Sequence, residues 1–260
     1  MRYLIRLKYN GEHFHGWQIQ PNAITVQEVL EQKLSMVLTK EVKVVGCGRT
    51  DTGVHASDYY AHFDLLDCKY SSKKLLFKLN CVLPDAIVIS ELRNVQQDFH
   101  ARFTATSREY KYYITKQKNP FNKNTWWIKY ELDTNKMQQA GKSLLGKKDF
   151  SSFAKLNTDV ANHICEVTHF DIKEEGSNVI ITISANRFLR NMVRAIVGTL
   201  ASVGLGKISV KEFIDVIDKK DRSAAGLSAP AQGLFLCAVK YPEAEITVIN
   251  KVEEEESGNE

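Results

Sequence analysis

One short segment carries most of the residue types from which a catalytic site can be built: Gly46-Cys47-Gly48-Arg49-Thr50-Asp51-Thr52-Gly53-Val54-His55-Ala56. Its three glycines permit unusual backbone angles and the close approach of a ligand. Arg49 and Asp51 have the i, i+2 spacing that places two side chains on the same side of an extended segment. A guanidinium there would keep the carboxylate ionised, and an ionised aspartate can attack an electrophilic carbon. A salt bridge within a loop is at least as common an arrangement.

Two known sequence patterns overlap this segment, and both fit poorly. A dinucleotide-binding loop also follows a strand, but its sixth position here is Asp51, whose carboxylate would repel a pyrophosphate, and no helix follows. An aspartic protease would share the tripeptide Asp51-Thr52-Gly53, but those enzymes need two such aspartates on an all-β scaffold. This chain has one copy and many predicted helices. A nucleophilic aspartate and a loop salt bridge are the two interpretations that remain from the chemistry alone.

The composition is that of a globular protein with a moderately basic body. Hydrophobic residues make up 43% of the 260 residues and charged residues 25%, which is ordinary for a soluble fold of one large or two modest domains. The net charge is +4, but residues 251–260 carry a net charge of −4, so the first 250 residues carry +8. Such a charge is compatible with a nucleic-acid partner without requiring one.

The cysteines and the N-terminus predict a cytoplasmic protein. Five widely spaced cysteines without a Cys-x-x-Cys motif argue against a disulfide framework and against a structural zinc site. The pair His13-x-His15 has no third ligand nearby, so no metal site is expected. Charges within residues 1–8 interrupt the apolar stretch that a signal peptide needs. No apolar run approaches the roughly 18 residues that span a bilayer.

Hydrophobic periodicity predicts strands and helices in alternation along the whole chain. Strands are predicted at residues 2–9, 42–47, 59–66, 86–92, 109–115, 168–173, 178–185 and 233–241. Helices are predicted at residues 25–39, 73–83, 134–145, 188–203 and 209–218. Thr25 and Glu28 have the spacing of a capping box at the start of the first helix.

The order of these elements favours an α+β fold with largely antiparallel mixed sheets flanked by helices over a doubly wound parallel sheet. We divide the chain near residue 98. Residues 1–98 form an α+β domain with the Asp51 loop, residues 99–248 form a second α+β domain, and the two halves are expected to be similar. The acidic tail at 249–260 is predicted to be disordered.

The segment around Asp51 resembles the catalytic signature of the tRNA pseudouridine synthase A family. Five further blocks stand in the family's order along nearly the whole chain: Tyr9-Asn10-Gly11 with Phe14-His15-Gly16-Trp17-Gln18-x-Gln20; Asp98-Phe99-His100-Ala101-Arg102-Phe103 with Arg108-Glu109-Tyr110-Lys111-Tyr112; Asp149-Phe150-x-Ser152-Phe153; Phe188-Leu189-x-x-Met192-Val193-Arg194-x-Ile196-Val197-Gly198; and Ala231-x-Gly233-Leu234. Six ordered blocks are far more specific than any one of them.

The resemblance implies a pseudouridine synthase fold with the catalytic cleft between the halves. It implies isomerisation of uridine to pseudouridine at positions 38, 39 and 40 of the tRNA anticodon stem-loop, with no cofactor consumed. Asp51 would be the nucleophile, Tyr110 would pack on the uracil, and Arg194 would be the ionic partner of Asp51. Arg49 would enter the stem as the target base flips out, which offsets part of the cost of flipping. His55 is expected to brace the loop.

The resemblance also implies a tRNA partner and a homodimer whose subunits jointly form the tRNA-binding surface. The matching tRNA contacts would come from Lys69, Phe99, His100, Ala101, Arg102, Phe103 and Lys118. Trp17 and the pair Trp126-Trp127 are interpreted as packing residues.

Three positions depart from the family pattern. Thr52 replaces a usual alanine, and Arg190 replaces a more common aromatic residue or histidine. The stretch 154–162 lacks the basic residue expected near Ala161. The alternative function is a non-catalytic tRNA-binding or RNA-chaperone protein with an inert Asp51, and a hydrolase is a third, weaker option.

Overall fold

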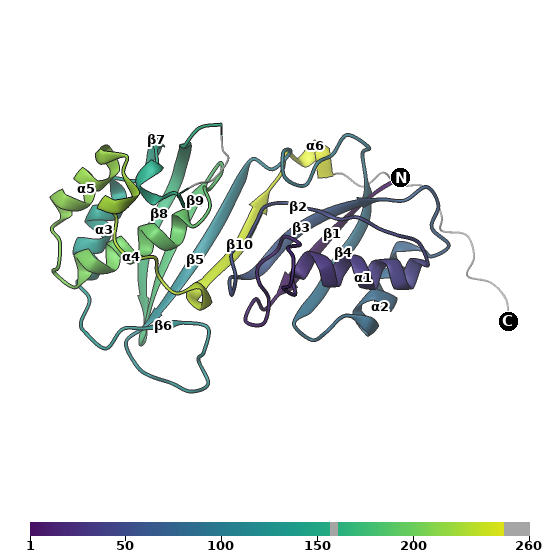
Figure 1. The fold of residues 1–260 in the computed structure, drawn as a ribbon, viewed down its shortest axis with the longest axis horizontal. Coiled ribbons are helices and arrows are strands. Elements are labelled where there is room, and N and C mark those ends of the chain that lie inside the picture. Colours follow the sequence, from purple (N-terminus) through teal and green to yellow (C-terminus); the bar gives the residue numbers. More distant parts are fainter. Residues whose placement is uncertain (157–160, 247–260) are drawn as a thin grey trace.

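The computed structural model describes residues 1–156 and 161–246, and its strands form one continuous sheet (Figure 1). The sheet has ten strands in the order β4-β1-β3-β10-β5-β9-β8-β7, with β2 beside β3 and β6 beside β5. Their bounds are β1 Arg2–Tyr9, β2 Val45–Gly46, β3 His55–Asp64, β4 Ile87–Val95, β5 Ser107–Thr115, β6 Trp126–Trp127, β7 Gly146–Asp149, β8 Ile164–Glu175, β9 Asn178–Ala185 and β10 Leu234–Lys240. The predicted tail at 249–260 lies outside the described residues.

Helices pack against both halves of the sheet. Their bounds are α1 Val26–Leu38, α2 Ser72–Val82, α3 Thr134–Lys142, α4 Met192–Gly204, α5 Val210–Lys219 and α6 Glu243–Ile246. The helix α2 packs on β4 and α1, while α3 packs on α4 and β8. No helix in the described ranges has the length and apolar character needed to cross a membrane. The predicted α+β architecture with a largely antiparallel sheet is confirmed, and the two halves share one sheet rather than having one each.

The central strand β10 joins the two halves. It pairs in parallel with β3, with Phe235 opposite His55 and Leu236 opposite Ala56, and antiparallel with β5. Because β3 begins directly after the Asp51 loop, this pairing brings that loop against the second half of the chain (Figure 1).

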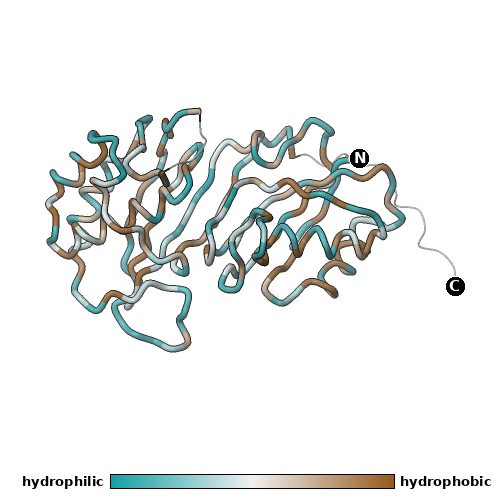
Figure 2. The backbone as a smooth tube through the Cα atoms, in the orientation of Figure 1, coloured by the Kyte–Doolittle hydropathy of each residue, from teal (hydrophilic) through white to brown (hydrophobic). Residues whose placement is uncertain are grey.

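Two hydrophobic cores lie along this sheet, and β10 contributes side chains to both of them. Leu236 and Val239 belong to the core built around β1, β3 and α1, whereas Leu234 belongs to the core built around α4, β8 and β9. Hydrophobic residues concentrate in these strands and helices, whereas the loop between β5 and β6 is mostly hydrophilic (Figure 2). The division at residue 98 stays a prediction, because the strand that completes the first core comes from the C-terminal part of the chain.

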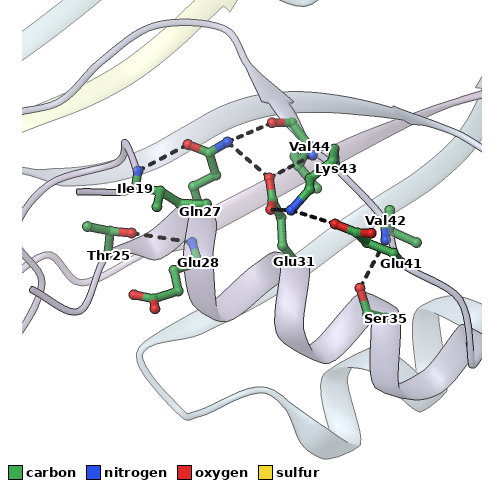
Figure 3. A network of polar contacts seen from close by, with 10 residues as sticks. All are labelled: Ile19, Thr25, Gln27, Glu28, Glu31, Ser35, Glu41, Val42, Lys43 and Val44. Atoms are coloured by element: carbon green, nitrogen blue, oxygen red, sulfur yellow. Dashed lines mark hydrogen bonds and ion pairs between the residues drawn. The ribbon is translucent and has the colours of Figure 1, made fainter. Parts of the chain in front are cut away.

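The predicted strand at 42–47 is much shorter than expected, because side chains of α1 bind the backbone groups that would otherwise pair with a neighbouring strand (Figure 3). The Val42 N–H donates to the Ser35 hydroxyl at 3.0 Å and the Val44 N–H donates to the Glu31 carboxylate at 2.9 Å. The Val44 carbonyl accepts from the Gln27 side chain at 2.9 Å. Only Val45–Gly46 is left to pair with β3.

Two other expectations are wrong in detail. The helix predicted to begin at Phe188 begins at Met192, because Asn191 has a left-handed backbone with φ of 66°. Trp17 is buried as predicted, but Trp127 is 44% exposed and is not a core residue.

Candidate active site

The loop that carries Asp51 is held in place by main-chain hydrogen bonds to the N-terminal motif. The Trp17 N–H donates to the Thr50 carbonyl at 3.2 Å, and the Gly53 N–H donates to the Phe14 carbonyl at 3.2 Å. Within the loop, the Val54 N–H donates to the Asp51 carbonyl at 3.1 Å. These bonds fix the backbone on both sides of the carboxylate.

Glycine is required where the N-terminal motif touches this loop. At Gly16 the backbone φ is +87°, and an added Cβ would lie 2.4 Å from the Thr50 carbonyl oxygen. At Gly11 an added Cβ would lie 2.0 Å from the Val54 carbonyl oxygen. The motif can approach the loop at Gly11 and Gly16 only because neither position carries a side chain.

His55 braces the same contact, which agrees with the expectation for this residue. Its Nδ1 atom accepts a hydrogen bond from the Gly11 N–H at 3.0 Å, and its ring stacks on Phe235 with centroids 4.5 Å apart. Burial lowers the pKa of His55, so the ring is neutral near pH 7. A neutral imidazole that already accepts from the backbone serves to position the loop.

Asp51 lies between two arginines from the second half of the chain. Its Oδ2 atom is 3.6 Å from Nη1 of Arg194, and its Oδ1 atom is 3.8 Å from Nε of Arg190. Arg194 is fixed in turn, because its Nε donates to the Ala229 carbonyl at 2.8 Å. Among the described residues these two are the cations within 4 Å of the carboxylate. The expected pairing with Arg49 is not formed; Arg49 is exposed, and the ion pairs of Asp51 come from the other half.

A cavity of about 690 Å³ opens beside Asp51. We call its two sides the loop wall, formed by Asp51 and Thr52, and the cationic wall, formed by Lys155, Leu156, Arg190, Asn191, Arg194, Arg222 and Ser228. The cleft therefore lies between the halves as predicted. Residues 157–160 of the stretch 154–162 lie outside the described residues.

Tyr110 lies in β5 close to this cavity without lining it. Its ring meets the ring of Phe188 edge to face, with centroids 5.1 Å apart. Burial raises the pKa of Tyr110 well above its usual value, and the nearby Cys47 thiol and Asp51 carboxylate act in the same direction. The hydroxyl therefore keeps its proton at neutral pH and can act as a hydrogen-bond donor.

The expected RNA-contact segment 99–103 divides into buried and exposed residues. Phe99 and Ala101 are fully buried in the first core, so their side chains are not available to a ligand. This corrects the expectation for those two side chains, since packing within the core takes up both. His100 is half-buried, Arg102 is exposed, and Phe103 is 74% exposed. The exposed side chains of this segment are therefore those of Arg102 and Phe103.

The backbone of this segment is anchored by side chains from several strands. The Phe99 carbonyl accepts from Arg2 at 2.6 Å, the Ala101 carbonyl from the Tyr241 hydroxyl at 2.7 Å, and the Arg102 carbonyl from Arg108 at 2.6 Å. Arg108 also donates to the Cys47 carbonyl at 3.2 Å. The same guanidinium thus connects the exposed segment with the residue that precedes the Asp51 loop.

The two predicted lysines lie away from the cavity. Lys69 is exposed, with its Nζ 5.2 Å from the centroid of the Tyr70 ring, and Lys118 is exposed, with its Nζ 5.3 Å from the centroid of the Trp127 ring. Neither lines the cavity.

Sequence reasoning missed most of the cationic wall. Arg190 was noticed as a departure from a family pattern, but nothing in its spacing indicated an ion pair with Asp51. Arg222 and Ser228 stand in a segment without periodicity, so the sequence held no signal for them.

Comparison with known proteins identifies the family. The family model described as tRNA pseudouridine synthase matches residues 6–104 and 140–242. The tRNA pseudouridine synthase A of Bacteroides thetaiotaomicron is 50% identical over 246 residues, covering 93% of this chain and 91% of that protein. The tRNA pseudouridine synthase A of Bacteroides fragilis is 49% identical over 244 residues, covering 93% of this chain and 97% of that protein.

One solved structure is also similar, at low scores. A Cbf5-Nop10-Gar1 complex aligns with a TM-score of 0.35 and 12% identity over 90% of this chain and 57% of that chain. This likeness is too distant to carry an argument, whereas the family model and the two relatives cover most of the sequence. The chain therefore belongs to the tRNA pseudouridine synthase family.

Proposed function

We propose that this chain isomerises uridine to pseudouridine at positions 38, 39 and 40 of the tRNA anticodon stem-loop, with Asp51 as the nucleophile. The observation that carries the proposal is the position of Asp51: it lines the cavity on a loop fixed by its backbone, 3.6 Å from Arg194. Two arginines place positive charge beside this carboxylate, and a carboxylate can attack an electrophilic carbon.

The reaction needs no cofactor, because it is an internal rearrangement. The bond between N1 of uracil and C1′ of the ribose breaks, the base rotates, and a bond forms between C5 and C1′. C5 loses a proton and N1 gains one, so no atom is added or removed. A carboxylate that forms a covalent intermediate and then leaves is sufficient as the nucleophile.

Tyr110 is proposed to pack on the uracil while the base rotates. A ring that stacks on a base contributes roughly 1–3 kcal/mol. The raised pKa of Tyr110 keeps its hydroxyl protonated, which suits a hydrogen bond to a uracil oxygen. Phe188 supports the ring from its edge.

The exposed cations are proposed to bind the RNA outside the cavity. Arg49 lies two residues from Asp51 and is exposed, which suits a side chain that fills the gap left by a flipped base. Arg102 and Phe103 present a cation and an aromatic ring together, and Lys69 and Lys118 extend the basic surface. We also propose that the active form is a cytoplasmic homodimer whose subunits share the bound tRNA.

The decisive experiment measures tritium release from tRNA labelled at C5 of uracil. The wild-type protein should release tritium, and Asp51→Ala should be slower by more than about 10³-fold while it binds tRNA with nearly unchanged affinity. Asp51→Asn is the matched control, because it keeps the size of the side chain and removes only the charge.

Two outcomes would contradict the proposal. Tight tRNA binding by the wild-type protein with no tritium release would indicate a binding protein or RNA chaperone. Release of free uracil would indicate a hydrolase.

A further inference from the structure

The cavity beside Asp51 holds more positive charge than the nucleophile needs. Among the described residues that line it, three are arginines, Arg190, Arg194 and Arg222, and one is a carboxylate, Asp51. Arg194 is sufficient as the ionic partner of Asp51, because it is the closer of its two arginines and is fixed by the Ala229 carbonyl. Uracil is neutral, so the remaining cations have no partner in the base itself.

Arg190 reaches the cavity from an open position. Its side chain is 58% exposed, and its Nε lies 3.8 Å from Asp51, beyond hydrogen-bond distance. A guanidinium has five N–H donors in a planar fork, so it can face one anion and still bind a second. Arg190 therefore has donors to spare at the mouth of the cavity.

Ser228 lies where two donors from the cationic wall converge. Its hydroxyl oxygen accepts from Nη2 of Arg222 at 3.1 Å and from Nδ2 of Asn191 at 2.7 Å. Both lone pairs of the oxygen are then used, so its O–H can only donate. No described residue accepts that hydrogen bond. Arg222 also donates to the carbonyls of Ala225 and Gly226. These acceptors are neutral, and no described carboxylate forms an ion pair with Arg222.

This part of the wall therefore presents positive charge and an unused hydroxyl donor. The complementary ligand is an anion whose exposed atoms are all acceptors, and in a nucleotide that group is the phosphodiester. We propose that Ser228, Arg190 and Arg222 form a subsite that binds a backbone phosphate adjoining the target uridine. This proposal rests on the proposed function in one respect, which is that the RNA bound at the subsite is tRNA.

Binding the phosphate here would hold the flipped nucleotide by its backbone while the base is free to rotate. A detached uracil must turn before it can rejoin the ribose. Contacts to the base alone therefore cannot hold the ribose in position beside Asp51. A phosphate anchored on the cationic wall would keep the ribose near Asp51 through that step.

The test combines a protein variant with a neutralised phosphate. A tRNA assembled by ligation carries one methylphosphonate, which has no charge, on the 5′ or the 3′ side of the target uridine. Wild-type protein should bind one of these tRNAs about 10-fold more weakly than the normal tRNA, the typical effect of losing a charge-assisted hydrogen bond. Arg190→Ala should bind the normal tRNA about 10-fold more weakly, and the neutral linkage should weaken it no further.

Two more variants separate the subsite from general electrostatics. Ser228→Ala should show a smaller loss of the same kind, because the cations remain. Lys211→Ala removes the same charge from an exposed position in α5 outside the cavity. Its effect should be independent of the neutral linkage, so the fold-decreases in tRNA affinity from the two changes should multiply. For Arg190→Ala, the slope of log affinity against log salt concentration should decrease by the amount expected for about one phosphate contact. Thermal unfolding should show that all the variants are folded.

The proposal is wrong if neither neutral linkage weakens tRNA binding by the wild-type protein. It is also wrong if the neutral linkage weakens binding by Arg190→Ala as much as it weakens binding by the wild-type protein. These readouts measure affinity and not activity. A protein that binds through this subsite but makes no pseudouridine would overturn the proposed function and leave the subsite standing.

Discussion

The loop wall and the cationic wall of the cavity position their functional groups in different ways. On the loop wall, Asp51 is placed by its own backbone. That backbone is held by the hydrogen bond that Gly53 donates to Phe14, by the one that Trp17 donates to Thr50, and by the close approach of Gly16. On the cationic wall, the charges of Arg190 and Arg194 stand at the ends of long side chains that are 58% and 22% exposed.

The difference matches the roles that we propose for the two walls, a nucleophile on one and RNA contacts on the other. A nucleophile must be held within a fraction of an ångström of its target, and a rigid backbone provides that. Cations that meet RNA must exchange water for phosphate and adjust to it, and a flexible guanidinium provides that. We therefore expect changes that disturb the loop wall to lower stability and rate together, and changes in the cationic wall to lower rate or affinity with little loss of stability.

After Asp51→Ala, the largest effect on the rate is expected from Arg194→Ala. Removing one partner of this partly buried ion pair should slow pseudouridine formation about 10³-fold, equivalent to about 4 kcal/mol. The free energy of unfolding should fall by only about 1 kcal/mol, mainly from the lost hydrogen bond to Ala229. Single-turnover tritium release and urea unfolding measure the two quantities. Arg194→Lys, which keeps the charge, should recover part of the rate, and an unchanged rate in Arg194→Ala would remove this residue from the catalytic machinery.

Gly16→Ala should instead disturb the backbone of the loop wall. The new Cβ would lie 2.4 Å from the Thr50 carbonyl oxygen at a φ of +87°, so we expect a loss of about 3 kcal/mol in the free energy of unfolding and a rate about 10-fold lower. Gly206→Ala is the control, because Gly206 has a φ of +68° with open space around it. It should lose about 1 kcal/mol and keep its rate. Equal losses in the two variants would show that the contact with Thr50 does not matter.

His62 lies in β3, the strand that follows the loop wall, and should make that half sensitive to acid. Burial lowers the pKa of His62 to about 4, with the charges of Arg2 and His100 acting in the same direction. An unfolded histidine titrates near 6.5, so the unfolded state binds the proton more readily at intermediate pH. The stability from the neutral ring is therefore complete above about pH 6.5 and is lost as the pH falls towards 4.

His62→Asn tests this dependence. Asn can still accept the hydrogen bond that the Ala101 N–H donates to the His62 ring at 3.1 Å, but it does not titrate. Between pH 7 and pH 5, the wild-type protein should lose about 2 kcal/mol more than the variant in urea unfolding. Equal losses would mean that the protonated ring is accommodated at no cost.

The smallest effect is expected from Ser209→Ala, at the start of α5 and outside both walls. Ser209 and Glu212 form a capping box, and its loss should lower the free energy of unfolding by about 1 kcal/mol. The rate of pseudouridine formation should not change. A slower rate would mean that any loss of unfolding free energy lowers the rate, wherever it occurs. The different effects of changes in the two walls could then not be assigned to their different roles.

Local structure could be predicted well wherever its cause was local. Thr25 caps α1 by accepting from the Glu28 N–H, and β1 and β9 have the predicted bounds, because caps and alternation depend on neighbours in sequence. The strand at 42–47 could not be predicted in the same way. Its residues alternate correctly, but the acceptor for the Val44 N–H is Glu31 in a helix, and periodicity carries no information on which element supplies a partner.

The sequence by itself determined the family and the α+β class and singled out Asp51 as the residue that we propose to react, because motifs and hydrophobic periodicity depend only on the order of residues along the chain. The family resemblance also pointed to Arg194 as the partner of that carboxylate, whereas only the tertiary structure showed that Arg190 lies beside it and that Arg49 does not pair with it. Arg49 is two residues away from Asp51 and forms no ion pair with it, whereas Arg190 and Arg194 are more than a hundred residues away and lie within 4 Å. The tertiary structure also decided that Phe99 and Ala101 are core residues while Phe103 is exposed. The physical reason is that charges and apolar groups interact through space, and the pairing of β3 with β10 sets the distances between the two halves.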